Sequence, residues 1–481
     1  MGAVRYLLIG VAAFLLFLLV RRALTDVDLL DFDPLYYHLP FAARIWGITS
    51  PSEFRFLPGI EPDYQGFPLL AEFLQGLFWR VSGHMQATNL VALCALLVYC
   101  AFAKVYLRVH PALMFLALLA VPLIQIHAAS SDVDLPANLA CAAMLVMVYL
   151  LFAGAIAPNW RNVAVFALAA AVAANTKFLQ APVVGLAGLA VAGWLLALYR
   201  ARRGEQRREA GWALLTLVVA APLVGATYLK NLVLFGDPFY PLSAGAGVQL
   251  STGPAFLAPN YLAHVPQSVR WLFSIFEIRA FDARRPVLWM GEQGNLPRGV
   301  PADRMGGYFF VYVIVLLALF GFLIVRSRSR AAWLAGGLFL AVSLVTSALP
   351  QSHELRYYLY WIILLISLTW YLLIRARARG RLQRFAPEYL GVLCGGILLA
   401  VVVLTNAVYL QPFTRVTFDG IVHAIGPEIR EAVAKNPNLC VVDSANLLFL
   451  YVDTFHPPLH YSVQGATDAD QCGSRLVLPV R

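Results

Sequence analysis

The chain has 481 residues, of which 60% are hydrophobic and only 13% are charged. A soluble globular protein averages about 45–50% apolar and about 25% charged residues, so this composition excludes a soluble globular protein. The net charge of +10 is not gathered into a basic cluster on a soluble domain, which excludes a nucleic-acid-binding surface. The six cysteines include no pair at zinc-ligand spacing, which excludes a zinc module and a disulfide-rich scaffold.

Apolar runs repeat along the chain at lengths close to the roughly 20 residues that cross a bilayer as a helix. Eleven such runs lie at approximately 6–20, 87–107, 111–128, 137–154, 162–175, 181–199, 211–228, 308–325, 331–349, 358–374 and 388–410. They predict an all-α polytopic membrane protein with about eleven transmembrane helices.

The basic residues between these runs predict the orientation. If the N-terminus is cytoplasmic, the basic residues of five loops all fall on the cytoplasmic side, as the positive-inside rule requires: Lys104, Arg108, Arg161, Arg200, Arg202, Arg203, Arg207, Arg208, Arg326, Arg328, Arg330, Arg375, Arg377, Arg379, Arg381 and Arg384. The outer loops are then about 24–86, 129–136, 229–307 and 350–357. The alternative for the first run is a cleaved signal peptide, although no A-x-A site precedes Asp26.

The segment 66–82 is apolar enough to suggest a further span, yet it contains Glu72, Gln75 and Arg80. Counting it as a span would reverse the orientation of every later loop. We therefore predict an amphipathic helix that lies on the outer face of the membrane.

The tail, residues 411–481, differs in composition from the rest of the chain. NLCVVDS, LHYSV and RLVLPV predict short strands, and SANLLFLYVDTF predicts a helix or a strand between them. The tail is thus expected to be a small α/β appendage on the outer side. Cys440 and Cys472 lie there, in a compartment that permits disulfides, so we expect either a bridge between them or two unpaired thiols.

Acidic residues gather at two outer ends of predicted spans. TDVDLLDFDPLYYHLPFAARIWG contains Asp26, Asp28, Asp31, Asp33, Tyr36, Tyr37 and His38, and SSDVDLPAN contains Asp132 and Asp134. One interpretation is structural, because Asp before the proline of a first helical turn is a common cap. The other is functional, because both acid groups would converge on one site if the spans pack together.

Three cations break the positive-inside bias at the outer boundary: Lys177, Lys230 and Arg356. They either snorkel or pair with the acids, or they bind an anionic ligand, for which a phosphate is well suited.

Several motifs together resemble the bacterial GT-C glycosyltransferases, integral-membrane enzymes that use polyprenyl-phosphate sugars. They are DFDPLYYHLPFAARIWG, YQGFPLLAEFLQGLFW, SSDVDLPANL, NTKFLQAP, YLKNLVLFGDPFYPL and ELRYYLYW, in the order of the family across about 1–375. The chain is similar in particular to the transferases for aminoarabinose, galacturonic acid and mannose. The resemblance implies a GT-C-like transmembrane catalytic domain at 1–410, and the tail 411–481 has no counterpart in it.

The resemblance also implies roles for residues. The catalytic acid of the first outer loop aligns with Asp33, the expected general base; Asp31 is its rival, because Pro34 follows Asp33 where many relatives carry an Asp-Glu pair. The lipid-phosphate cation resembles Arg356. The remaining expected substrate-binding residues are Tyr37, His38, Asp132, Asp134, Lys177, Lys230, His353 and Tyr357.

The resulting hypothesis is an inverting transferase that moves a sugar from undecaprenyl phosphate to a hydroxyl of a glycan, lipid or protein acceptor at the periplasmic face of the bacterial inner membrane. No cofactor is expected; if a divalent Mg or Mn ion is used, its ligands would be Asp31, Asp33, Asp132 and Asp134. The alternatives are a lipid-linked glycan ligase or polymerase with a pyrophosphate carrier and, with less support, a transporter, for which no internal repeat is visible.

Overall fold

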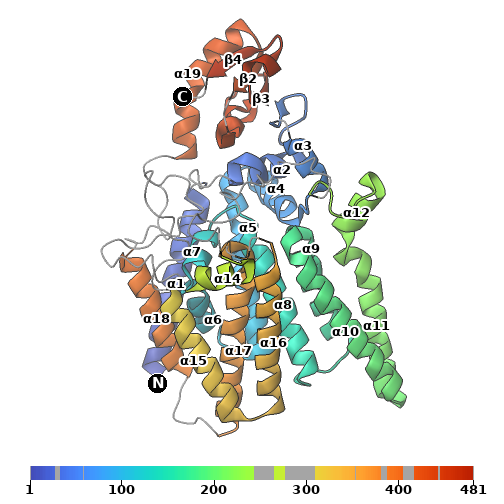
Figure 1. The fold of residues 1–481 in the computed structure, drawn as a ribbon. Coiled ribbons are helices and arrows are strands. Elements are labelled where there is room, and N and C mark those ends of the chain that lie inside the picture. The colour runs from blue at the N-terminus through green and yellow to red at the C-terminus, as the bar shows by residue number, and fades with distance from the viewer. Residues whose placement is uncertain are drawn as a thin grey trace.

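The structure is a computed structural model that describes residues 2–25, 27, 33–57, 59–242, 265–276, 309–350, 352, 354–380, 387–404, 417–442 and 445–479. Within these residues, long helices form a bundle with a small sheet at one end (Figure 1). We call this end the sheet end. The opposite end, where the arginine-rich connection between α15 (Phe309–Ser327) and α16 (Arg330–Ala348) lies, is the arginine end.

Each of the eleven predicted runs overlaps a helix. Besides α15 and α16, the helices that match these runs are α1 (Gly2–Thr25), α5 (Leu90–Phe102), α6 (Pro111–Leu119), α7 (Pro122–His127), α8 (Asp134–Phe152), α9 (Trp160–Thr176), α10 (Ala181–Ala201), α11 (Gly204–Val224), α12 (Ala226–Phe235), α17 (Leu359–Ala378) and α18 (Pro387–Leu404). Within the described residues, six helical segments are long and apolar enough to cross a membrane, and the bent pair α11 and α12 adds a seventh. Helices α15 and α18 contribute shorter apolar segments.

Two predicted runs differ from a single straight helix. The run 111–128 is divided between α6 and α7, because Pro122 at the start of α7 has no N–H to continue the ladder of α6. The run 211–228 bends by 52° at Gly225, between α11 and α12. The bend turns α12 away from the direction of α11 and carries Lys230 with it.

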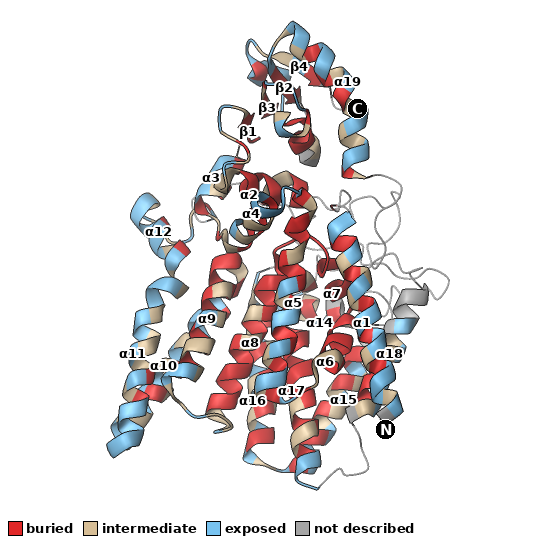
Figure 2. Ribbon diagram, turned by 180° about the vertical axis from the view of Figure 1, so that it is seen from behind, coloured by how far each residue is buried: buried red, intermediate tan, exposed pale blue. Residues whose placement is uncertain are grey.

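The centre of the bundle is formed by α8 and α17. In each of these two segments 83% of the apolar stretch is buried, against between 22% and 44% in the other four spans. Figure 2 shows the same contrast between buried α8 and exposed α11 and α18. Buried hydroxyls join the helices, as between Tyr99 and Ser367 (2.6 Å) and between Thr346 and Tyr360 (2.9 Å). Such bonds matter because lipid tails are as apolar as the helix faces.

The described part of the sheet has four parallel strands in the order β1-β3-β2-β4. The tail supplies β2 (Asn438–Val442), β3 (Ser462–Ala466) and β4 (Leu476–Pro479), so its three predicted strands are present. The edge strand β1 (Phe54–Arg55) comes from the first outer loop and was not predicted. The described part of the segment SANLLFLYVDTF forms two short 3₁₀ helices, η8 (Ala445–Tyr451) and η9 (Asp453–Phe455). Cys440 and Cys472 form a disulfide.

The tail and the first outer loop share one apolar core. Its loop side consists of the single π-helical turn η1 (Pro34–His38), α2 (Leu39–Ile45), α3 (Ile60–Gly66) and α4 (Leu70–Ser82); its tail side is α19 (Phe418–Lys435), η8 and the strands. The ring of Phe449 lies 5.5 Å from that of Phe54 and 6.2 Å from that of Trp79. We call this combined unit the outer layer.

Helix α4 corresponds to the predicted amphipathic helix, but its polar side faces the protein. Glu72 and Gln75 are buried, whereas Phe73 and Val81 are exposed. The helix therefore turns apolar side chains outward and directs two polar side chains at the sheet end of the bundle.

Candidate functional site

Charged and polar side chains meet where the outer layer covers the bundle. Asp33 immediately precedes η1, Asp134 begins α8, Lys177 follows α9, and Arg356 lies in the 3₁₀ turn η7 (Leu355–Tyr358) that leads into α17. We call the whole set the polar cluster: Asp33, His38, Glu72, His127, Asp132, Asp134, Lys177, Arg356 and Tyr357.

Arg356 joins the outer layer to the bundle. Its Nη1 donates a hydrogen bond to Asp33 Oδ2 at 3.0 Å, across 323 residues of sequence, and its Nη2 donates to the hydroxyl of Tyr357 at 3.2 Å. The side chains of Arg356 and Asp33 are 14% and 20% exposed, so a ligand can reach both.

Lys177 provides the second cation. It forms an ion pair with Asp134, and its Nζ lies 4.0 Å from the ring centroid of Tyr357. The guanidinium carbon of Arg356 is 4.9 Å from the same ring. Two cationic side chains are thus arranged around one aromatic ring, and each is paired with a carboxylate.

Two buried amides bind the backbone of η7 and the start of α17: Asn138 on α8, and Gln180, which directly precedes α10. Asn138 Nδ2 donates to the carbonyl oxygen of Arg356 at 2.9 Å, and Asn138 Oδ1 accepts from the backbone N–H of Tyr360 at 2.9 Å. Gln180 Nε2 donates to the carbonyl oxygen of Tyr357 at 3.1 Å. Sequence reasoning did not identify these two residues, although an amide inside an apolar helix is a recognisable signal.

Two carboxylate–imidazole pairs form the other side of the cluster. His38 Nδ1 lies 2.7 Å from Glu72 Oε1, and His127 Nδ1 lies 2.9 Å from Asp132 Oδ2; all four side chains are buried. Burial disfavours the imidazolium of His38, but the hydrogen bond to Glu72 and the nearby carboxylates together raise its pKa. Glu72 and His127 were not among the predicted site residues.

Tyr37 packs its ring against His38, with centroids 4.2 Å apart. Burial, and to a smaller extent the charge of Asp33, raises the pKa of the Tyr37 hydroxyl well above its ordinary value. The phenol therefore stays protonated at neutral pH and can serve as a hydrogen-bond donor.

The residues that could hold a metal differ from the predicted set. Ligand atoms of Asp33, His38 and Asp132 lie within 4.8 Å of one another, whereas Asp134 is paired with Lys177. Two carboxylates and an imidazole suit a divalent ion such as Mn²⁺. However, Asp33 already accepts a hydrogen bond from Arg356. The guanidinium therefore supplies a positive partner for this carboxylate without a metal ion.

Three predicted residues are placed elsewhere or lie outside the described residues. Lys230 is exposed on α12, and its Nζ donates to the carbonyl oxygen of Gln65 at 2.5 Å; its described contacts do not join the polar cluster. The bend at Gly225 accounts for this position. Asp31 and His353 lie outside the described residues, as do Asp26 and Asp28.

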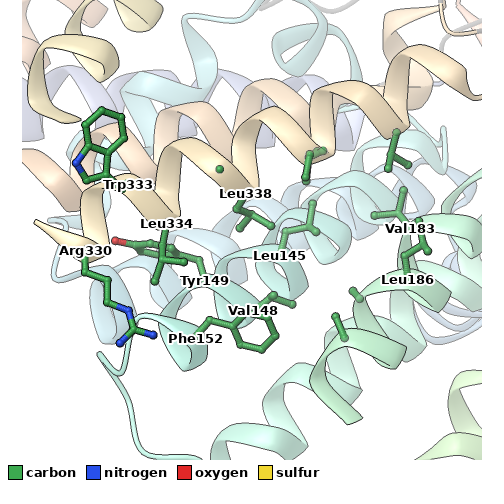
Figure 3. Close-up of a pocket in the computed structure, with 16 residues that line it drawn as sticks. Leu145, Val148, Tyr149, Phe152, Val183, Leu186, Arg330, Trp333, Leu334 and Leu338 are labelled. Carbon is green, nitrogen blue, oxygen red and sulfur yellow. The ribbon is translucent and has the colours of Figure 1, made fainter. Parts of the chain in front are cut away.

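An apolar groove of about 620 Å³ runs between α8, α10 and α16 (Figure 3). Arg330 and Phe152 lie at one end of it, and Val183 and Leu186 lie toward the other. Val183 is one helical turn beyond Gln180, whose amide holds the backbone of Tyr357. We call this cavity the first groove; it is almost wholly lined by hydrocarbon apart from Arg330.

The chain shares its fold with solved structures of another protein, to which it is only distantly similar in sequence. In particular, it is similar to ArnT from Cupriavidus metallidurans in the apo state, with a TM-score of 0.54 and 15% identity over 98% of this chain and 87% of that one. ArnT from the same organism bound to undecaprenyl phosphate gives a TM-score of 0.52 and 16% identity, over 98% and 89% of the two chains. No protein-family model and no curated protein matches the chain. The likeness confirms the predicted fold.

Proposed function

We propose that the protein is an inverting glycosyltransferase that moves a sugar from a polyprenyl phosphate to a hydroxyl of an acceptor. The observation that carries this proposal is the position of Arg356 and Lys177 around Tyr357, next to Asp33. The first groove, whose lining on α10 begins at Val183, offers space for a lipid chain. The fold it shares with an ArnT structure that holds undecaprenyl phosphate supports the same donor class.

The donor phosphate is expected at Arg356 and Lys177, with its polyprenyl chain in the first groove. A phosphate monoester has a second pKa near 6, so it can depart as a dianion without protonation if cations neutralise its charge. Phosphate bound to Arg356 also replaces Asp33 as the partner of the guanidinium. Donor binding would in this way release the carboxylate for chemistry.

The transfer step then uses Asp33 as general base. Its carboxylate accepts the proton of the acceptor hydroxyl while the acceptor oxygen forms a bond to the anomeric carbon. The bond from that carbon to the phosphate oxygen breaks, and its electron pair stays with the phosphate. One direct displacement inverts the anomeric configuration. The pairs of His38 with Glu72 and of His127 with Asp132 fix the positions of the side chains that lie around Asp33.

The side of the membrane follows from charge. The arginine end carries the basic loops and is therefore placed in the cytoplasm, which leaves the polar cluster and the tail on the periplasmic side of the inner membrane. Nucleotide sugars are confined to the cytoplasm, so a site on that side needs a donor already carried across the bilayer on a lipid.

We further propose that transfer needs no metal, because Arg356 and Lys177 already supply the positive charge that a phosphate leaving group requires. Dialysis of the purified enzyme against EDTA should leave turnover unchanged. Loss of turnover that Mn²⁺ or Mg²⁺ restores would instead assign Asp33, His38 and Asp132 to a metal.

The decisive experiment uses the protein in proteoliposomes with polyprenyl phosphate carrying a radiolabelled sugar. We expect the label to move covalently to an acceptor from envelope extracts, with release of polyprenyl phosphate. Movement of the labelled lipid across the bilayer without covalent transfer would indicate a transporter. Transfer only from a pyrophosphate-linked donor would indicate a ligase or polymerase.

A further inference from the structure

A second apolar groove, of about 730 Å³, lies between α9 and α11. These two helices stand at one side of the bundle (Figure 1). The small side chains of Ala164, Ala167 and Ala220 line the less exposed part of this groove, whereas Leu168 and Leu223 line it and are exposed. The second groove therefore opens to the side of the bundle, toward the surrounding membrane.

The helix pair that forms the second groove is fastened at its sheet end. Asn175 of α9 donates from Nδ2 to the carbonyl oxygens of Leu223 and Val224, at 2.9 and 3.1 Å. Its Oδ1 accepts hydrogen bonds from the backbone N–H and the hydroxyl of Thr227, at 3.0 and 2.9 Å. These bonds fix the spacing of α9 and α11 at that end, so the groove is preformed.

Two tryptophans and two arginines stand at the arginine end of the second groove. Trp160 begins α9 and Trp212 lies near the start of α11; both line the groove and are exposed. The guanidinium carbon of Arg161 is 5.5 Å from the ring centroid of Trp160. Arg208 precedes Trp212 by four residues, so it lies on the same face of α11, one turn closer to the arginine end. Tryptophan with neighbouring arginine is typical of a membrane–water interface.

The charges around this end of the groove favour an anion. Six arginines stand against two glutamates, and all eight are exposed: Arg161, Arg200, Arg202, Arg203, Arg207, Arg208, Glu205 and Glu209. Arg208 lies 3.7 Å from Glu205, with the two side chains 73% and 79% exposed. Because such an exposed ion pair is weak, the guanidinium of Arg208 can bind a phosphate in place of Glu205.

The length of the second groove matches one leaflet of a bilayer. Its lining on α11 extends from Trp212 to Leu223, a rise of about 16 Å at about 1.5 Å per residue. Half of the hydrocarbon core is about 15 Å thick. An acyl chain of one leaflet therefore fits the groove when its head group lies at the level of the tryptophans and arginines.

We infer that the second groove is a binding site for an anionic glycerophospholipid of the leaflet at the arginine end. One acyl chain lies between α9 and α11, and Arg161 and Arg208 bind the phosphate of the head group. This leaflet is on the opposite side of the membrane from the polar cluster, so the site is separate from the one proposed for the donor. A second copy of the chain suits this face less well, because pairing through it would bring two groups of arginines together.

Lipid binding to the purified full-length protein in detergent tests the site. Native mass spectrometry counts bound molecules of phosphatidylglycerol, of phosphatidylcholine with the same acyl chains, and of glycerol 3-phosphate. We expect one tightly bound phosphatidylglycerol and an affinity for phosphatidylcholine lower by about tenfold. Glycerol 3-phosphate, which has the phosphate without the chains, should not be retained. Polyprenyl phosphate should not displace the bound phosphatidylglycerol.

Matched variants locate the bound lipid. Arg161→Gln combined with Arg208→Gln should weaken phosphatidylglycerol binding by about 10–30-fold. Arg326→Gln combined with Arg328→Gln removes the same charge from the connection of α15 and α16, also at the arginine end, and should bind phosphatidylglycerol like the wild type. Ala220→Phe fills the groove while keeping every arginine, and it should weaken binding as well.

Several results would overturn the inference, and three of them need only the wild-type chain. These are equal affinity for phosphatidylglycerol and phosphatidylcholine, displacement of phosphatidylglycerol by polyprenyl phosphate, and a dimer whose formation excludes phosphatidylglycerol. An equal loss of binding in the two double variants would indicate a general attraction of the arginine end for anions rather than a site in the second groove. None of these results depends on the transferase reaction, so the inference and the proposed function fail separately.

Discussion

The polar cluster has a bundle half and an outer half, and the two are built differently. In the bundle half, Asp134 begins α8, Lys177 follows α9, and Arg356 lies in the turn that leads into α17, so all three lie at the ends of bundle helices. In the outer half, Asp33 and His38 belong to a loop that is held in place by the tail. The difference suggests a division of labour, in which the bundle binds the lipid phosphate and the outer layer performs proton transfer.

Both halves contain an accessible group beside a buried one. In the bundle half, Arg356 and Lys177 keep 14% and 18% of their side chains exposed, whereas Asp134 keeps 3%. In the outer half, Asp33 is 20% exposed, whereas His38 and Glu72 are almost fully buried against each other. On the proposed roles, substitutions in the bundle half should change donor affinity, and substitutions in the outer half should change turnover.

The largest effect is expected for Asp33→Asn. Loss of the general base should reduce turnover by about 10²–10⁴-fold, while the protein stays folded and still binds the donor. Single-turnover measurements with saturating donor would show this. Asp31→Asn is the matched control from the same loop; if it abolishes turnover and Asp33→Asn does not, Asp31 is the base.

Arg356→Ala should act on binding. Removal of a charge-assisted hydrogen-bond donor of about 1.5–3 kcal/mol should weaken polyprenyl phosphate binding by about 10–100-fold. Titration of the purified variant measures this, and Arg356→Lys should recover part of the affinity because the charge is kept. Arg80→Ala, on the exposed side of α4, should bind like the wild type. An unchanged affinity of Arg356→Ala would remove this residue from the phosphate site.

Replacement of both Cys440 and Cys472 by serine should weaken the outer layer selectively. Removal of a native disulfide from a small domain typically costs about 2–5 kcal/mol. We expect faster digestion of the tail by trypsin and a lower turnover, with donor affinity retained because the bundle half is unaffected. A loss of donor affinity equal to the loss of turnover would show that the two halves are not separable.

The smallest effect concerns pH and His456 in the tail. Burial, and to a smaller extent the charge of Arg430, lowers the pKa of His456, against the hydrogen bond to the carbonyl oxygen of Leu450. As the pH falls below the ordinary imidazole pKa of about 6.5, the unfolded chain binds a proton that the folded chain does not. Stability of the outer layer should therefore decrease from that pH down to the lowered pKa. His456→Gln should make trypsin resistance less dependent on pH in this range.

Much of the bundle was predictable because its signals are local. Runs such as 137–154 and 181–199 are continuous enough to correspond to α8 and α10 within a few residues. The pairing of an outer cation with an acid was one of the two interpretations of Lys177, and it forms such a pair with Asp134. The tail strands were also predictable, from short β-branched segments bounded by polar residues.

The unpredicted features depend on distant partners. Strand β1 has only two residues, Phe54 and Arg55, and it becomes a strand because β3 of the tail lies beside it. Glu72 was recognised as out of place in a span, but its partnership with His38 depends on how α4 packs above the bundle. Asn138 and Gln180 gain their roles from the position of η7, which follows from the packing of α17 against α8.

The sequence by itself determined that this is a polytopic membrane protein, where its helical runs and tail strands lie, and which acidic and basic residues lie near the ends of the spans. Each of these depends on composition and periodicity within a short window. Only the tertiary structure decided that Asp33 meets Arg356, that His38 meets Glu72, and that Lys177 meets Asp134. These contacts join segments up to hundreds of residues apart, and the packing of helices and the pairing of strands bring such segments together in ways that no local pattern encodes.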